Sequence, residues 1–432
     1  MTTTLHVDLS QTLHARFGGV GFHVFPELAA SPQRRQRKLY WRQLSPSFAR
    51  VNHRQRSDRA ELAALADYLS ELKETRAEVY VTTWDPPPLD PGQPRRDYAS
   101  HIADQMAYLV LERGCDHLRT YCMTNELTLV DWGVLRWDLP TFADYHCEIR
   151  RAFDERGLRI ELLASDASPH ASWGTLDWCR AHVDDITGVY GVHHYFNEHP
   201  PDDPGFYPWF LQQCGQFAGA ARQRGKDFII GEFGAGQNQG QLQQPGQRLD
   251  VCRYFGTPMV PMAGLQVAEG ILAMINGGVY ASGYWTFADM PDPVPPSNYW
   301  NQWGVLMQQG DDIVPRSIYP AIGLMARHFP GPAAVVGSTS DDPLVRIAAI
   351  RRSDGTAAVA IVNRNASTTE AEVSGIPTGL ALHQYVVEPR LQRAGPADPA
   401  GLPDPVRSLT TSTVSLPLSL PPQSLTVLAE VG

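Results

Sequence analysis

Three features of the 432-residue sequence predict an α/β fold, a (β/α)8 TIM barrel followed by a small C-terminal β-sandwich. Between residues 17 and 330, short apolar runs alternate with longer amphipathic stretches. From residue 118 to residue 228 the units recur about every 37 residues, which is the period of a βα repeat. After residue 334 the chain changes to short alternating strands broken by Gly and Pro, a texture typical of a sandwich.

Eight apolar runs account for the barrel strands, because buried parallel strands contain near-continuous apolar residues. The expected strands are residues 17–25, 47–52, 78–84, 117–125, 160–165, 188–196, 227–233 and 279–287. Amphipathic segments lie between them, and we expect helices over residues 59–76, 98–114, 139–157, 263–278 and 317–329. Eight such units in a row favour a closed barrel over a doubly wound sheet.

The domain organisation follows from the change in sequence pattern after residue 334. We expect residues 17–330 to form the barrel and residues 331–432 to form the β-sandwich, with residues 1–16 adding a strand to the sandwich. Tyr385 is the only Phe, Trp or Tyr after residue 330. Sugar-binding modules hold ligands by stacking them on exposed aromatic rings, so we interpret the sandwich as a structural flank.

Composition excludes several classes of partner. The formal net charge is -10 and no run of Lys or Arg is present, so we expect neither nucleic acid nor an anionic membrane as a partner. No segment reaches the roughly 20 apolar residues of a membrane helix, and residues 1–19 contain no apolar core of signal-peptide length. Six cysteines without CxxC spacing indicate buried free thiols. Together these features predict a cytoplasmic protein that acts on an uncharged or weakly polar substrate.

Glu232 is the first candidate for chemistry. It follows the apolar run Phe228, Ile229, Ile230 within two positions, where an unpaired carboxylate would be costly. In a parallel barrel the carboxyl ends of the strands carry the active site, and Glu232 lies at the end of the seventh predicted strand. The alternative interpretation is a buried carboxylate whose only function is an ion pair.

Asn125 and Glu126 end the fourth predicted strand in the sequence TYCMTNEL. Neighbouring side chains of an extended strand face opposite ways, so both reach one pocket only if the strand turns there. Asn197 and Glu198 form a competing pair, but it lies one strand from Glu232 rather than three. Two carboxyl groups in one pocket predict glycoside hydrolysis, in which one attacks the sugar carbon and the other handles the proton of the leaving oxygen.

These residues resemble the motifs of the clan A retaining glycosidases. In that clan an Asn-Glu pair ends the fourth strand and a Glu ends the seventh. The resemblance implies that Glu126 is the acid/base, that Glu232 is the nucleophile, and that Asn125 hydrogen-bonds the 2-hydroxyl of the sugar. It also implies the (β/α)8 fold over nearly the whole chain.

Further positions support the same resemblance. Clan members often carry His-x-Tyr on the sixth strand, matched by His193 and Tyr195, and the tyrosine would hydrogen-bond the nucleophile. Arg50 and Trp285 match the arginine of the second strand and the tryptophan of the eighth. Residues 82–88, TTWDPPP, are similar to the strand-three loop of the glucosylceramidase and glucuronoxylanase family, which also attaches a β-sandwich built from both termini.

Aromatic side chains in the expected rim loops are candidates for sugar stacking. We expect Trp84 and Trp285 to contact the ligand. The other rim aromatics are open to either stacking or ordinary packing, and they are Trp132, Trp137, Trp173, Tyr207, Trp209, Tyr299, Trp300 and Trp303. Asn52, His53 and Asp289, at the ends of the second and eighth strands, are weaker candidates for hydroxyl contacts.

Other chemistries fit the sequence less well, and we expect no cofactor and no metal. Gly234, Gly236 and Gly240 follow a strand with GxGxxxG spacing, and no apolar helix follows them, which disfavours a dinucleotide loop. Adjacent histidines on a strand point apart, which disfavours a metal site; the residues concerned are His193, His194, Glu198 and His199. A serine hydrolase is disfavoured because no GxSxG is present.

The sequence therefore predicts a retaining β-glycoside hydrolase acting by double displacement. Exo action on oligosaccharides or small glycosides is expected, since long polysaccharides do not enter cells. An endo-acting hydrolase of the glucanase or xylanase type and a catalytically inactive glycan-binding barrel are the alternatives. The oligomeric state is left open by the sequence.

Overall fold

The computed structural model describes most of the chain. The described residues are 2–26, 31–54, 58–83, 94–127, 138–196, 199–235, 261–291, 300–301, 303–309, 311–389, 401–411 and 415–431.

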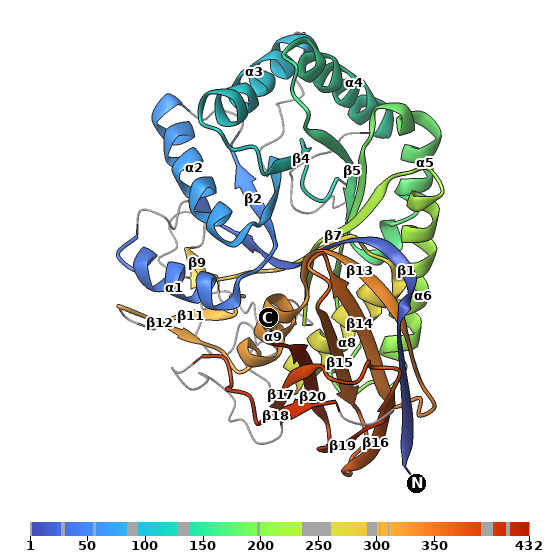
Figure 1. Ribbon diagram of the computed structural model, residues 1–432. Coiled ribbons are helices and arrows are strands. Elements are labelled where there is room, and N and C mark those ends of the chain that lie inside the picture. Colours follow the sequence, from blue (N-terminus) through green and yellow to red (C-terminus); the bar gives the residue numbers. More distant parts are fainter. Residues whose placement is uncertain are drawn as a thin grey trace, which may run out of the picture.

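Eight parallel strands close into a ring (Figure 1). They are β1 (Thr3–Val24), β2 (Phe48–His53), β3 (Glu78–Thr83), β4 (Leu118–Cys122), β5 (Glu161–Ala167), β6 (Val189–Tyr195), β7 (Asp227–Gly234) and β8 (Ala281–Tyr284). Each strand pairs in parallel with the next, and β8 pairs with the second half of β1 from Gly19 onward. The predicted (β/α)8 barrel is confirmed, and each expected strand overlaps an observed one, although β1 begins at Thr3 and so includes the N-terminal strand that was expected to be separate.

Helices surround the ring (Figure 1). Five lie where the periodicity predicts them: α2 (Arg59–Leu72), α3 (Arg95–Ala107), α4 (Leu139–Glu155), α8 (Pro261–Gly277) and α9 (Tyr319–His328). Three more, which the sequence patterns did not predict, are α1 (Arg34–Leu44), α5 (Thr175–His182) and α6 (Phe206–Arg222). Helix α1 buries Arg37, Trp41 and Leu44 at helical spacing, but one of the three is an arginine and most of the helix is polar. Helix α5 is only eight residues long.

Shorter elements complete the barrel part. The single turns are η2 (Lys73–Thr75), η3 (Tyr108–Glu112), η4 (His170–Ser172) and η5 (Asp184–Ile186). Two small hairpins follow β8, and their strands are β9 (Met290–Pro291), β10 (Trp300–Asn301), β11 (Leu306–Gln309) and β12 (Asp312–Pro315). Helix α2 begins with a capping box, in which the Asp58 carboxylate accepts hydrogen bonds from the backbone N–H groups of Ala60 and Glu61 and the Glu61 carboxylate accepts one from the backbone N–H of Asp58, so local sequence fixes its start.

The C-terminal part consists of strands. They are β13 (Pro330–Ser340), β14 (Val345–Arg352), β15 (Ala357–Asn363), β16 (Thr369–Ser374), β17 (Ala381–Val387), β18 (Arg407–Thr410), β19 (Ser415–Leu420) and β20 (Ser424–Glu430). The beginning of β1 pairs with β16 and β13 before the strand enters the ring. Figure 1 shows this blue segment beside the orange and red strands. The expected domain boundaries at residues 16/17 and 330/331 stay predictions.

Three apolar clusters hold the described parts. The largest lies between the barrel strands and the helices and extends to residues of the C-terminal strands. A smaller cluster, with Phe48, Tyr80 and Ile229, is formed by other side chains of the barrel strands. The third lies among the C-terminal strands and includes Leu5 and Val7 from β1. Because burial of apolar side chains contributes about 25 cal/mol per Å², the alternating residues of the first strand anchor the N-terminus to the C-terminal strands.

Two smaller predictions are tested by burial and helix length. Cys115, Cys122, Cys179 and Cys214 are buried free thiols as expected, whereas Cys147 is exposed on α4 and the prediction is wrong for it. Among the described residues, no helix combines the length and the apolar character that crossing a membrane requires.

Candidate active site

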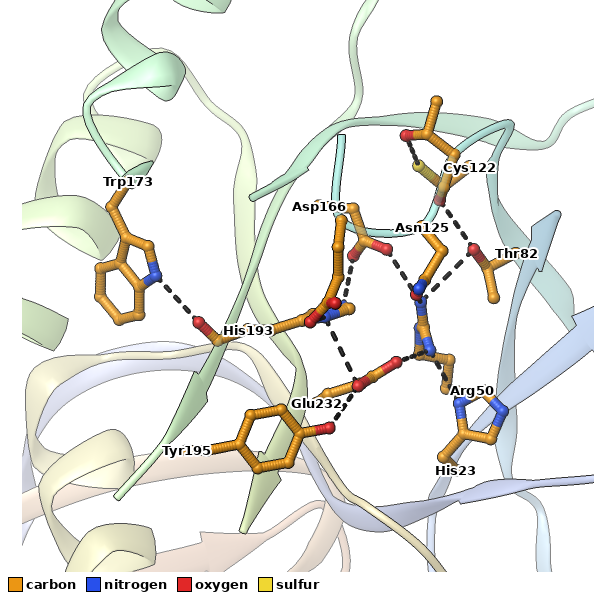
Figure 2. Close-up of polar contacts among 12 residues, drawn as sticks. His23, Arg50, Thr82, Cys122, Asn125, Asp166, Trp173, His193, Tyr195 and Glu232 are labelled. Atoms are coloured by element: carbon orange, nitrogen blue, oxygen red, sulfur yellow. Dashed lines mark hydrogen bonds and ion pairs between the residues drawn. The ribbon is translucent and has the colours of Figure 1, made fainter. Parts of the chain in front are cut away.

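Glu232 lies at the carboxyl end of β7 and is almost fully buried, with 3% of its surface exposed. Its carboxylate faces the interior of the ring, where Arg50 and Tyr195 donate hydrogen bonds to its two oxygens (Figure 2). Arg50 comes from β2 and Tyr195 from β6. The carboxylate is therefore held by donors from strands on both sides of the ring.

Arg50 is the hub of the buried charges, and its side chain is fully enclosed. Besides Glu232 it donates to Asp166 Oδ2 at 2.8 Å and to Asn125 Oδ1 at 2.7 Å. It also bonds His23 Nδ1 at 2.8 Å, and since a guanidinium has only donors, His23 accepts. Burial alone lowers the pKa of Arg50, but the charges of Asp166 and Glu232 outweigh it and raise that pKa well above its ordinary value.

His193, on β6, joins three carboxylates. Its Nε2 lies 2.9 Å from Asp166 Oδ1, and its Nδ1 lies 2.9 Å from Glu126 Oε1 and 3.5 Å from Glu232 Oε2. Burial lowers its pKa, but the charges of Asp166 and Glu232 overcome this and raise the pKa of His193 to about 10. The ring is thus an imidazolium at neutral pH and donates from both nitrogens.

Asn125 and Glu126 both reach this cluster because the strand ends before them. Strand β4 stops at Cys122, and Thr82 donates to the carbonyl of Thr124 at 2.9 Å, which fixes the turn. Glu126 then takes a left-handed backbone conformation with φ of 51°, which is uncommon for a residue other than glycine. The chain therefore turns after β4, as we expected if Asn125 and Glu126 both enter one pocket.

Asp166, at the end of β5, belongs to the same cluster, and sequence reasoning missed it. It is fully buried, and its backbone is left-handed with φ of 57°. Burial raises its pKa, but the charges of His193 and Arg50 lower it to about 2. The signal that identified Glu232, a carboxylate directly after an apolar strand, was also present here in the sequence ELLASD.

The electrostatic setting of Glu232 contains opposing effects. Burial raises its pKa, and the negative charge of Glu126 adds to this. The positive charges of His193 and Arg50 and the hydrogen bond from Tyr195 lower it, but burial prevails and the pKa of Glu232 is raised above its ordinary value. Burial and the nearby carboxylates raise the pKa of Tyr195 well above its ordinary value, so the phenol keeps its proton and acts as a donor.

Two of the aromatic candidates, Trp285 and Trp173, differ in their contacts. Trp285 is 7% exposed and packs with His23, Phe25 and Trp303 at ring distances of 4.5, 5.4 and 5.8 Å, beside the charged cluster. Trp173 is fully buried, and its indole donates to the carbonyl of His193 at 3.0 Å, so it is a structural residue.

Several candidates fall outside the described residues. They are Trp84, Trp132, Trp137, Asn197, Glu198, Gly236, Gly240 and Tyr299, together with the side chain of Trp300.

Of the weaker hydroxyl candidates, Asp289 and His53 make contacts within the protein, whereas Asn52 is 8% exposed and its Oδ1 has no hydrogen-bond partner among the described residues. Asp289 accepts from Arg316 at 2.7 and 2.9 Å and from the backbone of Gly304 and Gln308, so both of its oxygens are engaged. His53 is buried with Nδ1 3.4 Å from Thr83 Oγ1, and burial lowers its pKa to about 4.

The neighbouring histidines point apart, as expected for a strand. His193 faces the carboxylates, whereas His194 packs among the rings of Trp173, Trp209 and Phe210. Single ligand atoms of Glu126, His193 and Glu232 lie within 4.8 Å of one another, a spacing that would also suit a metal ion. A doubly protonated imidazole has no lone pair for a metal, so hydrogen bonding is the use that this arrangement favours.

Comparison with known proteins gives likeness in structure alone. No protein-family model matches the sequence, and no curated protein matches it. The GH30 xylanase C catalytic domain of Talaromyces cellulolyticus has a TM-score of 0.68 at 14% identity, covering 99% of this chain and 100% of that one. The GH51 α-L-arabinofuranosidase of Thermotoga petrophila has a TM-score of 0.71 at 13% identity, covering 100% of both chains.

A second GH30 protein, the endoxylanase of Clostridium papyrosolvens, has a TM-score of 0.67 at 14% identity, covering 99% of this chain and 100% of that one. These neighbours are a xylanase domain, an arabinofuranosidase and an endoxylanase, and their likeness confirms the predicted fold, a (β/α)8 barrel with additional C-terminal strands.

Proposed function

We propose that this chain is a retaining β-glycoside hydrolase, with Glu232 as the nucleophile and Glu126 as the acid/base. One observation carries the proposal: carboxylate oxygens of these two residues lie within 4.8 Å of one another at the carboxyl end of the barrel. Retaining enzymes hold their two carboxyl groups about 5–5.5 Å apart, whereas inverting enzymes need about 6.5–9.5 Å for an intervening water.

The surroundings of the two carboxyl groups differ in the way that the two roles require. Glu232 is enclosed and receives hydrogen bonds on both oxygens from Arg50 and Tyr195, which favours an anionic nucleophile. Glu126 is 12% exposed at its side chain, and in the described part of the chain only its Oε1 is hydrogen-bonded, to His193. Its Oε2 is the oxygen that would carry the proton.

Double displacement then runs in two steps. Glu232 attacks the anomeric carbon while Glu126 gives its proton to the departing oxygen, forming a covalent glycosyl ester. Glu126 next takes a proton from water, which attacks the same carbon and releases the sugar with retained configuration. Because Arg50 offers only donors, Asn125 must turn its Oδ1 toward it, which leaves the amide N–H groups of Asn125 for the sugar 2-hydroxyl.

Trp285 is the proposed floor of the subsite for the cleaved sugar, since its ring is held beside the cluster by His23, Phe25 and Trp303. Apolar faces of sugars stack on such rings. The proposed substrate is an uncharged glycoside, and exo action is the mode we propose from the sequence. The likeness to an α-L-arabinofuranosidase favours one second candidate, hydrolysis of α-L-arabinofuranosides.

A panel of nitrophenyl glycosides, together with xylan, tests the activity and separates these candidates. Release of monosaccharide from chain ends supports exo action, and release of oligosaccharides supports endo action. Binding of glycans without turnover of any substrate would instead support a glycan-binding barrel.

The decisive variant is Glu232→Ala, which we expect to lower turnover by at least about 10⁴-fold because no nucleophile is left. Added azide should restore turnover and yield a glycosyl azide of inverted configuration. Glu161→Ala is a matched control, because Glu161 is an exposed glutamate at the opposite end of the barrel. Near-normal turnover of Glu232→Ala would disprove the assigned role.

A further inference from the structure

Asp166 lies in the charged cluster but is not one of the two carboxyl groups that we propose to react with the substrate. One of its oxygens accepts from Arg50 at 2.8 Å and the other accepts from His193 at 2.9 Å (Figure 2). Both partners are fully buried, and each extends to one of the other carboxylates: Arg50 to Glu232 and His193 to Glu126. Asp166 thus lies behind both halves of the proposed machinery.

A glycine on β7 allows close packing around the contact between Asp166 and His193. Gly231 precedes Glu232, and a Cβ at this position would lie 3.3 Å from Asp166 Oδ1 and 3.3 Å from His193 Nε2. Such contacts are tighter than ordinary van der Waals contact, so glycine leaves the space in which the carboxylate and the imidazole meet. Asp166 itself has a left-handed backbone at this point, with φ of 57°.

The contact of Asp166 with Arg50 and His193 balances buried charges. The cluster contains two cations, Arg50 and His193, and three carboxylates, those of Asp166, Glu232 and Glu126. An uncompensated charge in such a buried site is costly. With Asp166 and Glu232 ionised, the two cations are balanced, and Glu126 remains as the carboxyl that exchanges a proton.

We propose that Asp166 is a positioning residue that acts through His193. By accepting the Nε2–H of His193, it keeps the ring doubly protonated and aims Nδ1–H at Glu126 Oε1, so that Oε2 of Glu126 is presented to the leaving oxygen. The catalytic effect of this inference rests on the proposed function. The protonation state of His193 can be measured whether or not the protein turns over a substrate. The raised pKa of His193, to about 10, agrees with the geometry.

Several charged or titratable groups around His193 affect its pKa. Asp166, Glu126 and Glu232 contact it directly. The charge of Arg50 lowers its pKa. His23 is neutral in this setting, because burial and the charges of Arg50 and His193 lower the pKa of His23 well below its ordinary value. Tyr80 and Tyr195 complete the surroundings, and both keep their protons because burial raises their pKa values.

The first measurement is ¹⁵N NMR of histidine-labelled protein, with the His193 signal assigned through its loss in His193→Gln. In the wild-type protein we expect two protonated ring nitrogens from pH 6 to 9. In Asp166→Asn, whose asparagine tolerates the left-handed backbone, we expect His193 to lose a proton within this range. His194 serves as an internal reference, because burial lowers its pKa to about 3 and keeps it neutral.

The second measurement is a double-mutant cycle on an alkyl glycoside, because its poor leaving group needs the proton of Glu126. We expect Asp166→Asn and His193→Gln each to lower kcat by about 100-fold, the lower range for a misplaced acid/base. If Asp166 acts through His193, the double variant is no slower than His193→Gln alone. We also expect KM to change less than kcat, because the positioned proton acts in the transition state.

Three outcomes would overturn the inference: a wild-type His193 with one protonated nitrogen at pH 7, an unchanged His193 titration in Asp166→Asn, or multiplicative losses in the double variant. The first needs no variant, so it decides the question even if Asp166→Asn fails to fold. An inactive Glu232→Ala combined with a fully active Asp166→Asn would leave the proposed function intact and remove only this inference.

Discussion

The two ends of the barrel hold charged residues in opposite ways. At the carboxyl end, Arg50, Asp166, His193 and Glu232 are enclosed, and each bonds at least two other members of the cluster. At the amino end, charged side chains line an open hollow of about 410 Å³, and the salt bridge from Arg16 to Asp227 there leaves 66% of the Arg16 side chain exposed.

This difference shows why one end and not the other is suited to chemistry. In the hollow, water screens the charges, and exposed ion pairs contribute little. Inside the cluster, the low dielectric strengthens each interaction, so removing one partner leaves an expensive unpaired charge. The pKa values follow the same division: nearby cations lower that of Asp166 to about 2, whereas burial, Glu78 and Glu161 raise that of Asp227 to about 6 against the charge of Arg16.

The largest difference between the two ends should appear when each loses its arginine. Arg50→Met removes the guanidinium shared by Asp166 and Glu232 and leaves these two buried carboxylates with His193 as their one charged partner among the described residues, so we expect the free energy of unfolding to fall by about 3–5 kcal/mol. Arg16→Met, at the amino end, should cost less than about 1 kcal/mol. Urea unfolding of both variants at pH 7 measures this, and equal losses would contradict the comparison.

The next largest effect is expected from Glu126→Ala at the carboxyl end. Loss of the proton donor should lower kcat by about 10²–10⁴-fold for alkyl glycosides with poor leaving groups. For aryl glycosides with activated leaving groups the first step needs no proton, so the loss should be much smaller. Rates over a series of leaving groups test this, and equal losses along the series would assign the acid/base role elsewhere.

A smaller effect concerns acid stability on the outer side of β6. Burial lowers the pKa of His194 to about 3, so the neutral form stabilises the fold above pH 6.5, and this contribution is lost as the pH falls toward 3. Between pH 7.5 and pH 4.5, His194→Phe should lose about 2 kcal/mol less unfolding free energy than the wild-type protein. His182→Phe, at an exposed position, is the control and should follow the wild type.

The smallest effect belongs to the amino end. The raised pKa of Asp227 means that its contribution is fully present below pH 3.8 and is lost as the pH rises through about 6. Asp227→Asn should therefore lose less unfolding free energy between pH 4 and pH 7.5 than the wild type, by about 1 kcal/mol after allowance for solvent screening. Hydrolysis rates should stay unchanged, and a reduced rate would connect the two ends of the barrel.

Particular residues show how far sequence reasoning reached. The order of the strands was predictable because buried parallel strands are continuous apolar runs. Helix α1 was missed because its buried positions are few and include Arg37, and α5 because it is only eight residues long. Helix α6 was missed although its buried residues Phe206, Phe210 and Cys214 recur at helical spacing. Glu232 stood out as a carboxylate after an apolar strand, whereas Asp166, in the same kind of position, was overlooked.

Some assignments needed tertiary contacts. Trp173 and Asp289 had the same sequence context as ligand-binding residues, yet one donates to the backbone of β6 and the other is fully engaged by Arg316. A side chain at a rim is free for a ligand only if its neighbours leave it free, and those neighbours are distant in sequence.

By itself, the sequence determined the eight strands, their closure with helices between them, and the positions of Glu126 and Glu232 at strand ends, because these depend on local apolar pattern and on chain order. Only the tertiary structure decided which charges balance one another. The bonds of Asp166 to Arg50 and His193 join residues 116 and 27 positions apart, and whether a buried carboxylate is ionised depends on such partners rather than on its own segment of chain.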